Sequence, residues 1–339
     1  MTELLLFSIA LITTGFGVAG FRRWSLSRGL LDVPNDRSSH VTPTPRGGGV
    51  IVVTVSLLLY AYITLYITNN INIYYLASAC LVAAISWLDD LYSLSSVIRL
   101  SVHSVAAVIL IYGTGYLHDI LVPGAEWRFF LGRTGLIVSF LWIVWMINSY
   151  NFMDGIDGLA GSQAVVAGVA WLTFGYFFGY PTAYYFGGVI AFSSIGFLIY
   201  NWSPATVFMG DVGSAFLGFT FAALPLLEVE TSSRNSNTLF FAGVSFVWFF
   251  LFDTVFTFIR RVLRAERVWT AHREHLYQRM IAQGKSHSSV TLIYAGFACA
   301  VALSFFIGLR FRGSWELLVV FTIVWLSIVL FLISRKKRD

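Results

Sequence analysis

The chain has 339 residues, of which 57% are hydrophobic and only 12% are charged, and its mean hydropathy is +0.76. A soluble core cannot absorb that much apolar sequence, whereas repeated apolar runs of about 18–20 residues are typical of membrane helices. The formal net charge of +5 is small and dispersed. It therefore argues against a nucleic-acid-binding protein and fits basic residues that anchor helix ends at a membrane surface.

The first apolar run indicates an uncleaved membrane helix. Glu3 stands where a signal peptide would carry basic residues, and no small-residue cleavage site follows the run. Arg22 and Arg23 follow it instead, which predicts an N-terminus on the outer side. Cys80 and Cys299 fall inside apolar runs, so we expect packing roles for them and neither a disulfide nor a metal site.

Hydropathy predicts an all-α polytopic membrane protein that forms a single domain over residues 1–339. The eleven predicted spans are 3–20, 47–67, 74–89, 98–116, 134–151, 162–179, 183–200, 214–228, 238–259, 290–309 and 314–334. An odd number of spans places the termini on opposite sides. With the N-terminus outside, the only Lys and Arg residues on the outer side are Arg128, Arg133, Arg234, Arg310 and Arg312. This bias predicts an N-out, C-in topology.

Acidic side chains gather in the half of the chain that this topology makes cytoplasmic. They are Asp32, Asp36, Asp89, Asp90, Asp154, Asp157, Asp211 and Asp253. A cluster of acids facing an anionic leaflet is a poor membrane anchor, but its oxygens suit a divalent cation. The sequence therefore predicts a functional site at the cytoplasmic face.

A first loop rich in polar residues and Gly, 148–161, separates two apolar runs. Asp154 and Asp157 are three residues apart, which places them on one side if this end is helical. The glycines allow close approach of the backbone to a ligand. Asn and Asp beside Gly also form ordinary turns, so the loop by itself leaves both readings open.

Asp89 and Asp90 end the third predicted span. Adjacent carboxylates at a membrane boundary repel each other and lose solvation, and a bound cation or a raised pKa would relieve both costs. One carboxylate could accept a proton while the other orients it or binds metal. A charged helix stop is the alternative.

A second loop of this type, 201–214, also joins two spans on the predicted cytoplasmic side. Asp211 stands between glycines and could approach a metal–phosphate group closely. Gly213 and Ser214 open a helix, whose N-terminal amides favour anions. Phe208 could stack on a planar base, although a buried aromatic residue is the plainer reading.

Basic residues of the first cytoplasmic loop, Arg37, His40 and Arg46, could hold phosphates, unless the loop is simply solvated. In the last large loop His272, His275 and Arg279 share a face if helical. The His272–His275 pattern differs from both zinc protease arrangements, which disfavours a zinc hydrolase. A carboxylate inside the ninth span, Asp253, is a functional candidate or half of a structural ion pair.

These motifs together resemble the polyprenyl-phosphate N-acetylhexosamine-1-phosphate transferase superfamily, glycosyltransferase family 4. The resemblance covers most of the chain. It is carried by Asp89-Asp90, by Asn148-x-x-Asn151-x-x-Asp154-Gly-Ile-Asp157-Gly-Leu-Ala, and by Asn201-x-x-Pro204-Ala-x-x-Phe208-Met-Gly-Asp211-x-Gly-Ser. The last two motifs are long and specific.

The resemblance implies an enzyme of the bacterial cytoplasmic membrane. Polyprenyl phosphate, such as undecaprenyl phosphate, would attack the β-phosphorus of a UDP-N-acetylhexosamine, releasing UMP and leaving a polyprenyl-diphospho-sugar. This is the first step of O-antigen or related cell-envelope polysaccharide synthesis. Mg²⁺, or Mn²⁺ in its place, would be the cofactor. A homodimer is one assembly that the resemblance leaves open.

The resemblance also assigns roles by position. Asp211, with Asp154, would bind the metal ion, and Asp89 would be the general base or position the lipid phosphate, with Asp90 beside it. The residues implied in substrate binding are Asn151, Asp157, Asn201, Phe208, Arg37, His40, Arg46, His272, His275 and Arg279. Phe208 would face uracil, and Asn201 would support the metal region.

Two departures from the family pattern stand out. Ser93 occupies the position where relatives often carry Lys or Asp, and Glu274 stands where relatives have His. The His-Arg-x-His-x-Tyr-Gln form that begins at His272 is similar to the branch that starts O-antigen chains with a 6-deoxy sugar, N-acetylfucosamine or N-acetylquinovosamine.

The main alternative to a transferase is a proton-coupled secondary transporter, since intramembrane acids also mark ion paths. Transporters usually place their site at the midplane between repeats, whereas nearly all acids here fall at one interface and only Asp253 lies deeper. A non-catalytic scaffold would not explain so many carboxylates at the boundary.

Overall fold

The computed structural model describes residues 2–34, 42–121, 128–231, 236–267, 273–309 and 315–335. The elements in chain order are α1 (Thr2–Arg28), β1 (Leu31–Asp32), β2 (Thr44–Pro45), α2 (Gly49–Tyr62), the π-helical turn η1 (Ile63–Ile67), α3 (Ile73–Tyr92), α4 (Ser96–Thr114), β3 (Asp119–Leu121), β4 (Arg128–Phe130), α5 (Thr134–Phe152), α6 (Leu159–Phe178), α7 (Pro181–Asn201), α8 (Gly210–Thr231), α9 (Ser236–Phe246), α10 (Trp248–Leu263), α11 (Leu276–Ala282), α12 (His287–Gly308) and α13 (Trp315–Ser334).

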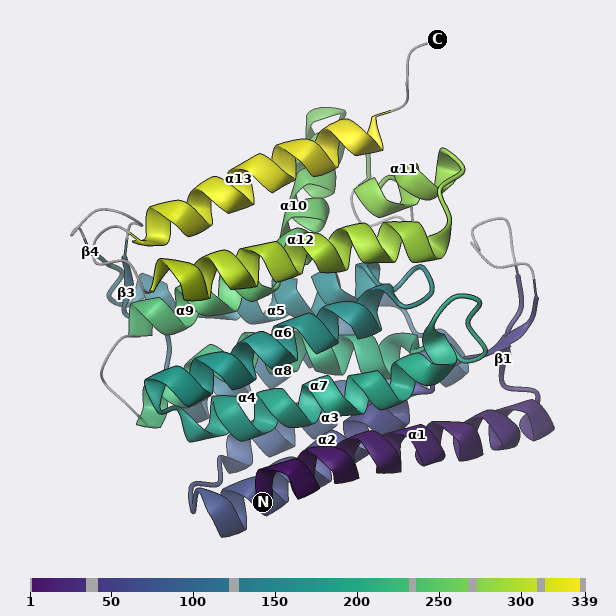
Figure 1. The fold of residues 1–339 in the computed structure, drawn as a ribbon, viewed down its shortest axis with the longest axis horizontal. Helices are drawn as coiled ribbons and strands as arrows, with labels where there is room; N and C mark the ends of the chain where they lie inside the picture. Colours follow the sequence, from purple (N-terminus) through teal and green to yellow (C-terminus); the bar gives the residue numbers. More distant parts are fainter. Residues whose placement is uncertain are drawn as a thin grey trace.

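Among the described residues, ten helices are long and apolar enough to cross a membrane, and α9 with α10 would make an eleventh span. Within the described ranges, strands occur only as two antiparallel hairpins, β1–β2 and β3–β4. The prediction of an all-α polytopic membrane protein is therefore confirmed. Because α1 and α13 both run toward the end that carries β1 and α11, the termini lie toward opposite ends of the bundle (Figure 1). Which end faces the cytoplasm stays a prediction.

The ninth predicted span, 238–259, is wrong as one straight helix, because α9 and α10 are bent by 73° at their junction. Gln163 on α6 donates its Nε2 hydrogen to the carbonyl of Phe246 at 2.7 Å, next to the break. Beyond the break, Asp253 accepts the backbone N–H of Leu276 at the start of α11. These bonds to other elements satisfy polar groups on both sides of the bend, which stabilises it.

Helix ends differ from the predicted ones in a way that matters for the acidic residues. α8 begins at Gly210 rather than at 214, so Asp211 lies in its first turn. Gly210 has φ +77°, and a Cβ there would lie 2.6 Å from Asp90 Oδ2. α3 continues to Tyr92. The acidic pair of α3 therefore projects from its last turns toward the start of α8.

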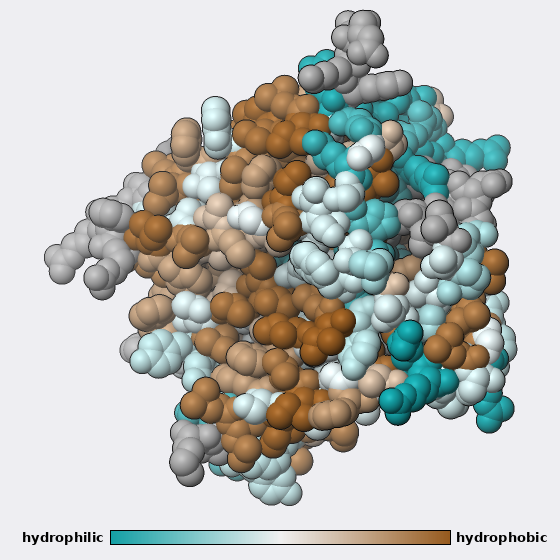
Figure 2. Space-filling view, turned by 45° about the vertical axis from the view of Figure 1, so that its right-hand side comes forward, coloured by the Kyte–Doolittle hydropathy of each residue, from teal (hydrophilic) through white to brown (hydrophobic). Residues whose placement is uncertain are grey.

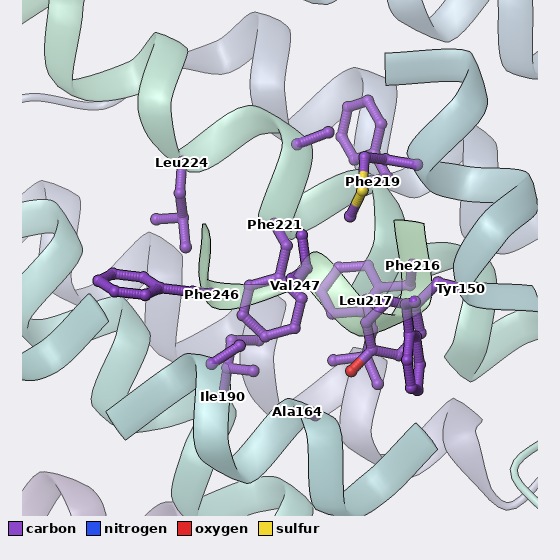
Figure 3. Packing of buried hydrophobic residues seen from close by; sticks show 14 of the residues in the cluster. Tyr150, Ala164, Ile190, Phe216, Leu217, Phe219, Phe221, Leu224, Phe246 and Val247 are labelled. Atoms are coloured by element: carbon purple, nitrogen blue, oxygen red, sulfur yellow. The ribbon is translucent and has the colours of Figure 1, made fainter. Parts of the chain in front are cut away.

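α8 is the central helix, and 94% of its most apolar window is buried. Its aromatic residues pack against Tyr150 of α5, Ile190 of α7 and Phe246 of α9 (Figure 3). Small residues permit close helix approach, since membrane helices associate through tight packing. A Cβ on Gly218 would lie 2.5 Å from the carbonyl oxygen of Met146 on α5. This packing fixes the first turn of α8 relative to α3 and α5.

Polar side chains are concentrated toward one end of the molecule. Figure 2 shows a broad apolar surface over the helices and hydrophilic residues gathered toward the end that carries α11 and the C-terminus of α13. The apolar surface suits contact with lipid. The hydrophilic end is where the sequence predicts the site.

Candidate active site

Asp90 connects the end of α3 to the beginning of α8. Its Oδ1 accepts the backbone N–H of Asp211 at 2.9 Å, and its Oδ2 accepts that of Val212 at 3.0 Å. The N-terminal N–H groups of a helix lack intrahelical partners, and a carboxylate at that position also interacts favourably with the helix dipole. The Asp90 side chain is 1% exposed. Asp90 therefore acts as an external cap that places Asp211 beside α3.

Two arginines bind the carboxylates. Arg46 places Nε 2.8 Å from Asp90 Oδ1 and Nη2 2.9 Å from Asp211 Oδ1. Arg99 places a single nitrogen, Nη1, 2.6 Å from Asp89 Oδ2 and 3.0 Å from Asp211 Oδ2. Both carboxylate oxygens of Asp211 thus contact a guanidinium group.

Arg46 reaches the site because its loop is bonded to the loop before α8. Phe208 donates its N–H to Pro45 O at 2.8 Å and accepts the N–H of Gly48 at 2.9 Å. A Cβ on Gly48 would lie 2.4 Å from a side-chain carbon of Val207, so this contact requires glycine. Burial lowers the pKa of the Arg46 guanidinium, but Asp211 and Asp90 outweigh that effect and raise it above its ordinary value.

Arg99 was not among the residues predicted for the site. A signal was present, because an arginine in the first turns of an apolar helix needs a nearby anion. Asp89 also accepts the N–H of Leu94 at 2.6 Å. Ser93, between them, adopts φ 52° and ends α3. The turn after α3 therefore directs both Asp89 and Arg99 toward Asp211.

Asn151 and Asp154 approach the same carboxylates from the end of α5. The Nδ2 of Asn151 donates to Ser214 Oγ in the first turn of α8 at 3.1 Å. Burial, together with the charges of Asp211 and Asp90, raises the pKa of Asp154 well above its ordinary value. The structure thus brings the predicted acids of α3, α8 and the 148–161 loop together.

Asp157 and Asn201 instead bond the loops to one another. Asp157 accepts the N–H of Ala205 at 3.1 Å, and its Oδ1 lies 3.4 Å from Nδ1 of His287. Burial raises the pKa of Asp157, but the hydrogen bonds from His287 and Ala205 outweigh it, so the pKa is lowered. His287, at the start of α12, belongs to no sequence motif and was not predicted for the site.

The buried side chain of Asn201 spans both polar loops. Its Oδ1 accepts the N–H of Gly158 at 3.1 Å, and its Nδ2 donates to Val207 O at 2.9 Å. Gly158 has φ +76°, which favours glycine, and it precedes α6. Asn201 therefore fixes the two loops relative to each other through backbone groups.

The second polar cluster surrounds Asp253. Its carboxylate lies 3.1 Å from Nδ1 of His275, and it accepts hydrogen bonds from the backbone of Leu276 and from the hydroxyl of Tyr294 at 2.8 and 2.6 Å. His275 is buried and caps α11, which carries Arg279. Among the predicted phosphate-binding residues, Arg37, His40 and His272 lie outside the described residues.

An apolar cavity of about 260 Å³ lies between α4, α5 and α10 and reaches the start of α11. Its lining residues are Leu100, Val144, Trp145, Asn148, Ser149, Phe152, Thr254, Thr257, Phe258, Arg261 and His275. Leu100 follows Arg99 directly, so the turn of α4 that carries Arg99 borders this cavity.

The donor chemistry of the cluster suits a hard divalent cation. In the part of the chain that the structure describes, no three His, Cys, Asp or Glu side chains already form a metal-ligand group. Mg²⁺ does not require one, because it is commonly held by one or two carboxylates with water and substrate phosphates as further ligands. Asp211 and Asp154 can supply such oxygens, provided that one of the guanidinium groups on Asp211 moves aside.

Comparison with known proteins identifies the family. The family model described as glycosyl transferase family 4 matches residues 72–228, which include the acids from Asp89 to Asp211. A probable undecaprenyl-phosphate N-acetylglucosaminyl 1-phosphate transferase of Bacillus subtilis is 30% identical over 327 residues, covering 94% of this chain and 88% of the relative. The chain belongs to glycosyl transferase family 4.

Other family members show the same similarity over most of their length. The undecaprenyl-phosphate α-N-acetylglucosaminyl 1-phosphate transferase of Escherichia coli O157:H7 is 29% identical over 95% of this chain and 88% of its own. The decaprenyl-phosphate N-acetylglucosaminephosphotransferase of Mycobacterium tuberculosis is 26% identical over 84% of this chain and 77% of its own. The chain is therefore a multi-pass membrane transferase of this family.

Proposed function

We propose that the protein transfers an N-acetylhexosamine 1-phosphate group from a UDP-sugar to polyprenyl phosphate. The observation that carries this proposal is the convergence of Asp89, Asp154 and Asp211 with Arg46 and Arg99 beside an apolar cavity. Such a site offers cationic groups for phosphates, oxygens for a metal ion, and an apolar space for a lipid. The relatives' names, which specify polyprenyl phosphate acceptors, support the same reaction class.

In the reaction, an oxygen of the polyprenyl phosphate forms a bond to the β-phosphorus of the UDP-sugar while the bond from that phosphorus to the UMP oxygen breaks. UMP carries away the electron pair, and the product is a polyprenyl-diphospho-sugar. Asp89 would accept the last proton of the lipid phosphate or position that phosphate, because Arg99 holds it in the same cluster as Asp211. Mg²⁺ or Mn²⁺ held by Asp211 and Asp154 would offset the charge on the phosphoryl oxygens.

The other residues of the site hold the reactants in place. Arg46 would hold the donor diphosphate. Asn151 would fix the first turn of α8, which carries Asp211, through its bond to Ser214. Phe208, in the loop before α8 that is hydrogen-bonded to the loop of Arg46, would stack on uracil. The apolar cavity would take the first isoprene units of the acceptor, since Leu100, which lines the cavity, directly follows Arg99 in α4.

We further infer the finer assignments from the sequence resemblance. The donor would be a 6-deoxy-N-acetylhexosamine, N-acetylfucosamine or N-acetylquinovosamine, although the relatives above are named for N-acetylglucosamine. The site would face the cytoplasm in a bacterial inner membrane, and the product would start O-antigen or a related polysaccharide.

The test uses purified protein in nanodiscs with Mg²⁺, undecaprenyl phosphate, and UDP-N-acetylglucosamine, UDP-N-acetylfucosamine and UDP-N-acetylquinovosamine as donors. UMP release together with a lipid-linked sugar product is expected with at least one donor. Asp211→Asn should abolish turnover, whereas Asp119→Asn, in the hairpin at the opposite end of the bundle, should not. No UMP from any donor, or substrate uptake into liposomes without a lipid product, would favour the transporter instead.

A further inference from the structure

We propose that Arg99 is an exchangeable counter-cation: it gives up the carboxylates of Asp89 and Asp211 when a divalent cation binds them and then holds the phosphate of the acceptor. This inference rests on the proposed function, because it assigns a phosphate-binding role within the same site. It concerns residues of this chain whose contacts are given above. It makes Arg99 a binding residue whose position depends on the metal ion.

The contacts of the two arginines are unequal. Arg46 uses two different nitrogens, and one of them binds Asp90, whose oxygens also hold the N-terminus of α8. The loop of Arg46 is further fixed by backbone hydrogen bonds to Phe208. Arg46 is therefore anchored at several points, and its release would disturb α8.

Among the described residues, Arg99 is held through one nitrogen only. Its Nη1 serves both Asp89 and Asp211, while its Nε is buried and has no hydrogen-bond partner among the described residues. The side chain is 30% exposed. A long side chain attached through one terminal atom can change rotamer without breaking other bonds. Of the two arginines, Arg99 is the one that can leave Asp211.

A divalent cation and Arg99 compete for the same oxygen. Arg99 Nη1 lies 3.0 Å from Asp211 Oδ2, whereas Mg²⁺ binds carboxylate oxygens at about 2.0–2.1 Å. Both are positively charged, so their joint presence at that oxygen is disfavoured. Metal binding at Asp211 therefore favours displacement of the Arg99 guanidinium.

The displaced guanidinium has a defined place to go. Leu100, the next residue of α4, lines the apolar cavity, so the turn of α4 that carries Arg99 borders the cavity. A lipid whose chain occupies that cavity would bring its phosphate to this point. Guanidinium groups bind phosphate oxygens with strong, charge-assisted hydrogen bonds. Metal and lipid phosphate would thus each favour binding of the other, as linkage requires.

The experiment measures Mn²⁺ binding by electron paramagnetic resonance and farnesyl phosphate binding by calorimetry, on wild type and Arg99→Gln in nanodiscs. We expect Arg99→Gln to bind Mn²⁺ about three- to tenfold more tightly, because a competing charge is gone. It should bind farnesyl phosphate, measured with Mn²⁺ present, at least about tenfold more weakly, because a charge-assisted contact is lost. A purely structural role would weaken both, so opposite signs are diagnostic.

Arg260→Gln is the matched control, since Arg260 pairs with Glu274 at 3.1 Å and not with the site carboxylates. It should leave Mn²⁺ affinity unchanged. Arg99→Lys is the second variant if Arg99→Gln does not fold, and it should keep Mn²⁺ affinity within about threefold of wild type because the competing charge remains. Three results would overturn the exchange. They are weaker or unchanged Mn²⁺ binding in folded Arg99→Gln, a change in Mn²⁺ affinity of more than about threefold in Arg99→Lys, and no Mn²⁺ binding by wild type. UMP release by wild type, measured separately, decides the proposed function.

Discussion

Replacing Asn201 with Ala should uncouple the two polar loops of the site and lower the stability of the whole bundle. The Asn201 side chain is buried and makes hydrogen bonds of 3.1 Å to Gly158 N and 2.9 Å to Val207 O. Alanine leaves both backbone groups without these partners. An unsatisfied buried polar group costs about 1–3 kcal/mol, so the two together predict a loss of roughly 2–6 kcal/mol, less whatever the loops recover by relaxing.

The assay is thermal unfolding in a fixed detergent, followed by intrinsic tryptophan fluorescence. At roughly 2 °C per kcal/mol for a large domain, the midpoint should fall by on the order of 4–12 °C. Asn201→Asp keeps the acceptor for Gly158 and loses the donor to Val207, so its midpoint should also fall. Asn148→Ala is the control, because within the described residues the Asn148 amide donates only to Val144 O of its own helix.

An Asn201→Ala midpoint within about 1 °C of wild type would refute the reasoning, because it would mean that the two loops hold their positions without the Asn201 bonds. A fall of the same size in Asn148→Ala would refute it as well, since the loss would then be unrelated to the loops.

Three further predictions follow from the same structure. The pKa of Asp157 is lowered in the folded state, so its contribution to folding stability is present above its ordinary pKa of about 4 and is lost as the pH falls through the lowered value. The stability difference between wild type and Asp157→Asn should therefore be largest at about pH 6–8 and shrink below about pH 4. A difference in unfolding midpoint that does not change with pH would contradict this. A Cβ on Gly49 would lie 2.5 Å from Gly213 Cα, so Gly49→Ala should displace the start of α8, lower the free energy of unfolding by about 1–3 kcal/mol and reduce UMP release. Gly20→Ala is the control, because Gly20 has open space around it, and it should change neither the stability nor UMP release. Gln163→Leu removes the bond beside the bend between α9 and α10 and should cost about 1–3 kcal/mol in the same unfolding assay; an unchanged midpoint would mean that the bend does not depend on it.

The elements of the site were predictable where the residues that matter are close together in sequence. The Asp/Gly loops interrupt apolar runs, and the carboxylates of Asp89, Asp154 and Asp211 fall at one side of the predicted topology. Their proximity in the structure follows because helices that cross a membrane bring alternate loops to the same face. The metal ion, the sugar donor and the orientation stay predictions.

Other features could not be read from the sequence. Three interactions of the site join residues that are 10 to 130 positions apart. They are the capping of α8 by Asp90, the contact of Arg99 with two carboxylates, and the pairing of His287 with Asp157. The side-chain packing between helices selects these partners. Hydropathy reports only which segments are buried.

The sequence by itself determined that the chain forms apolar helices and which loops carry charge, because a backbone in lipid must satisfy its own hydrogen bonds and charged groups must stay at the boundary. The tertiary structure alone decided the 73° break between α9 and α10 and which cation contacts which carboxylate. The physical reason is that Gln163, Asp253 and Arg99 act on partners supplied by other helices. Their effect depends on how closely the helices pack, and small residues such as Gly218 set that distance.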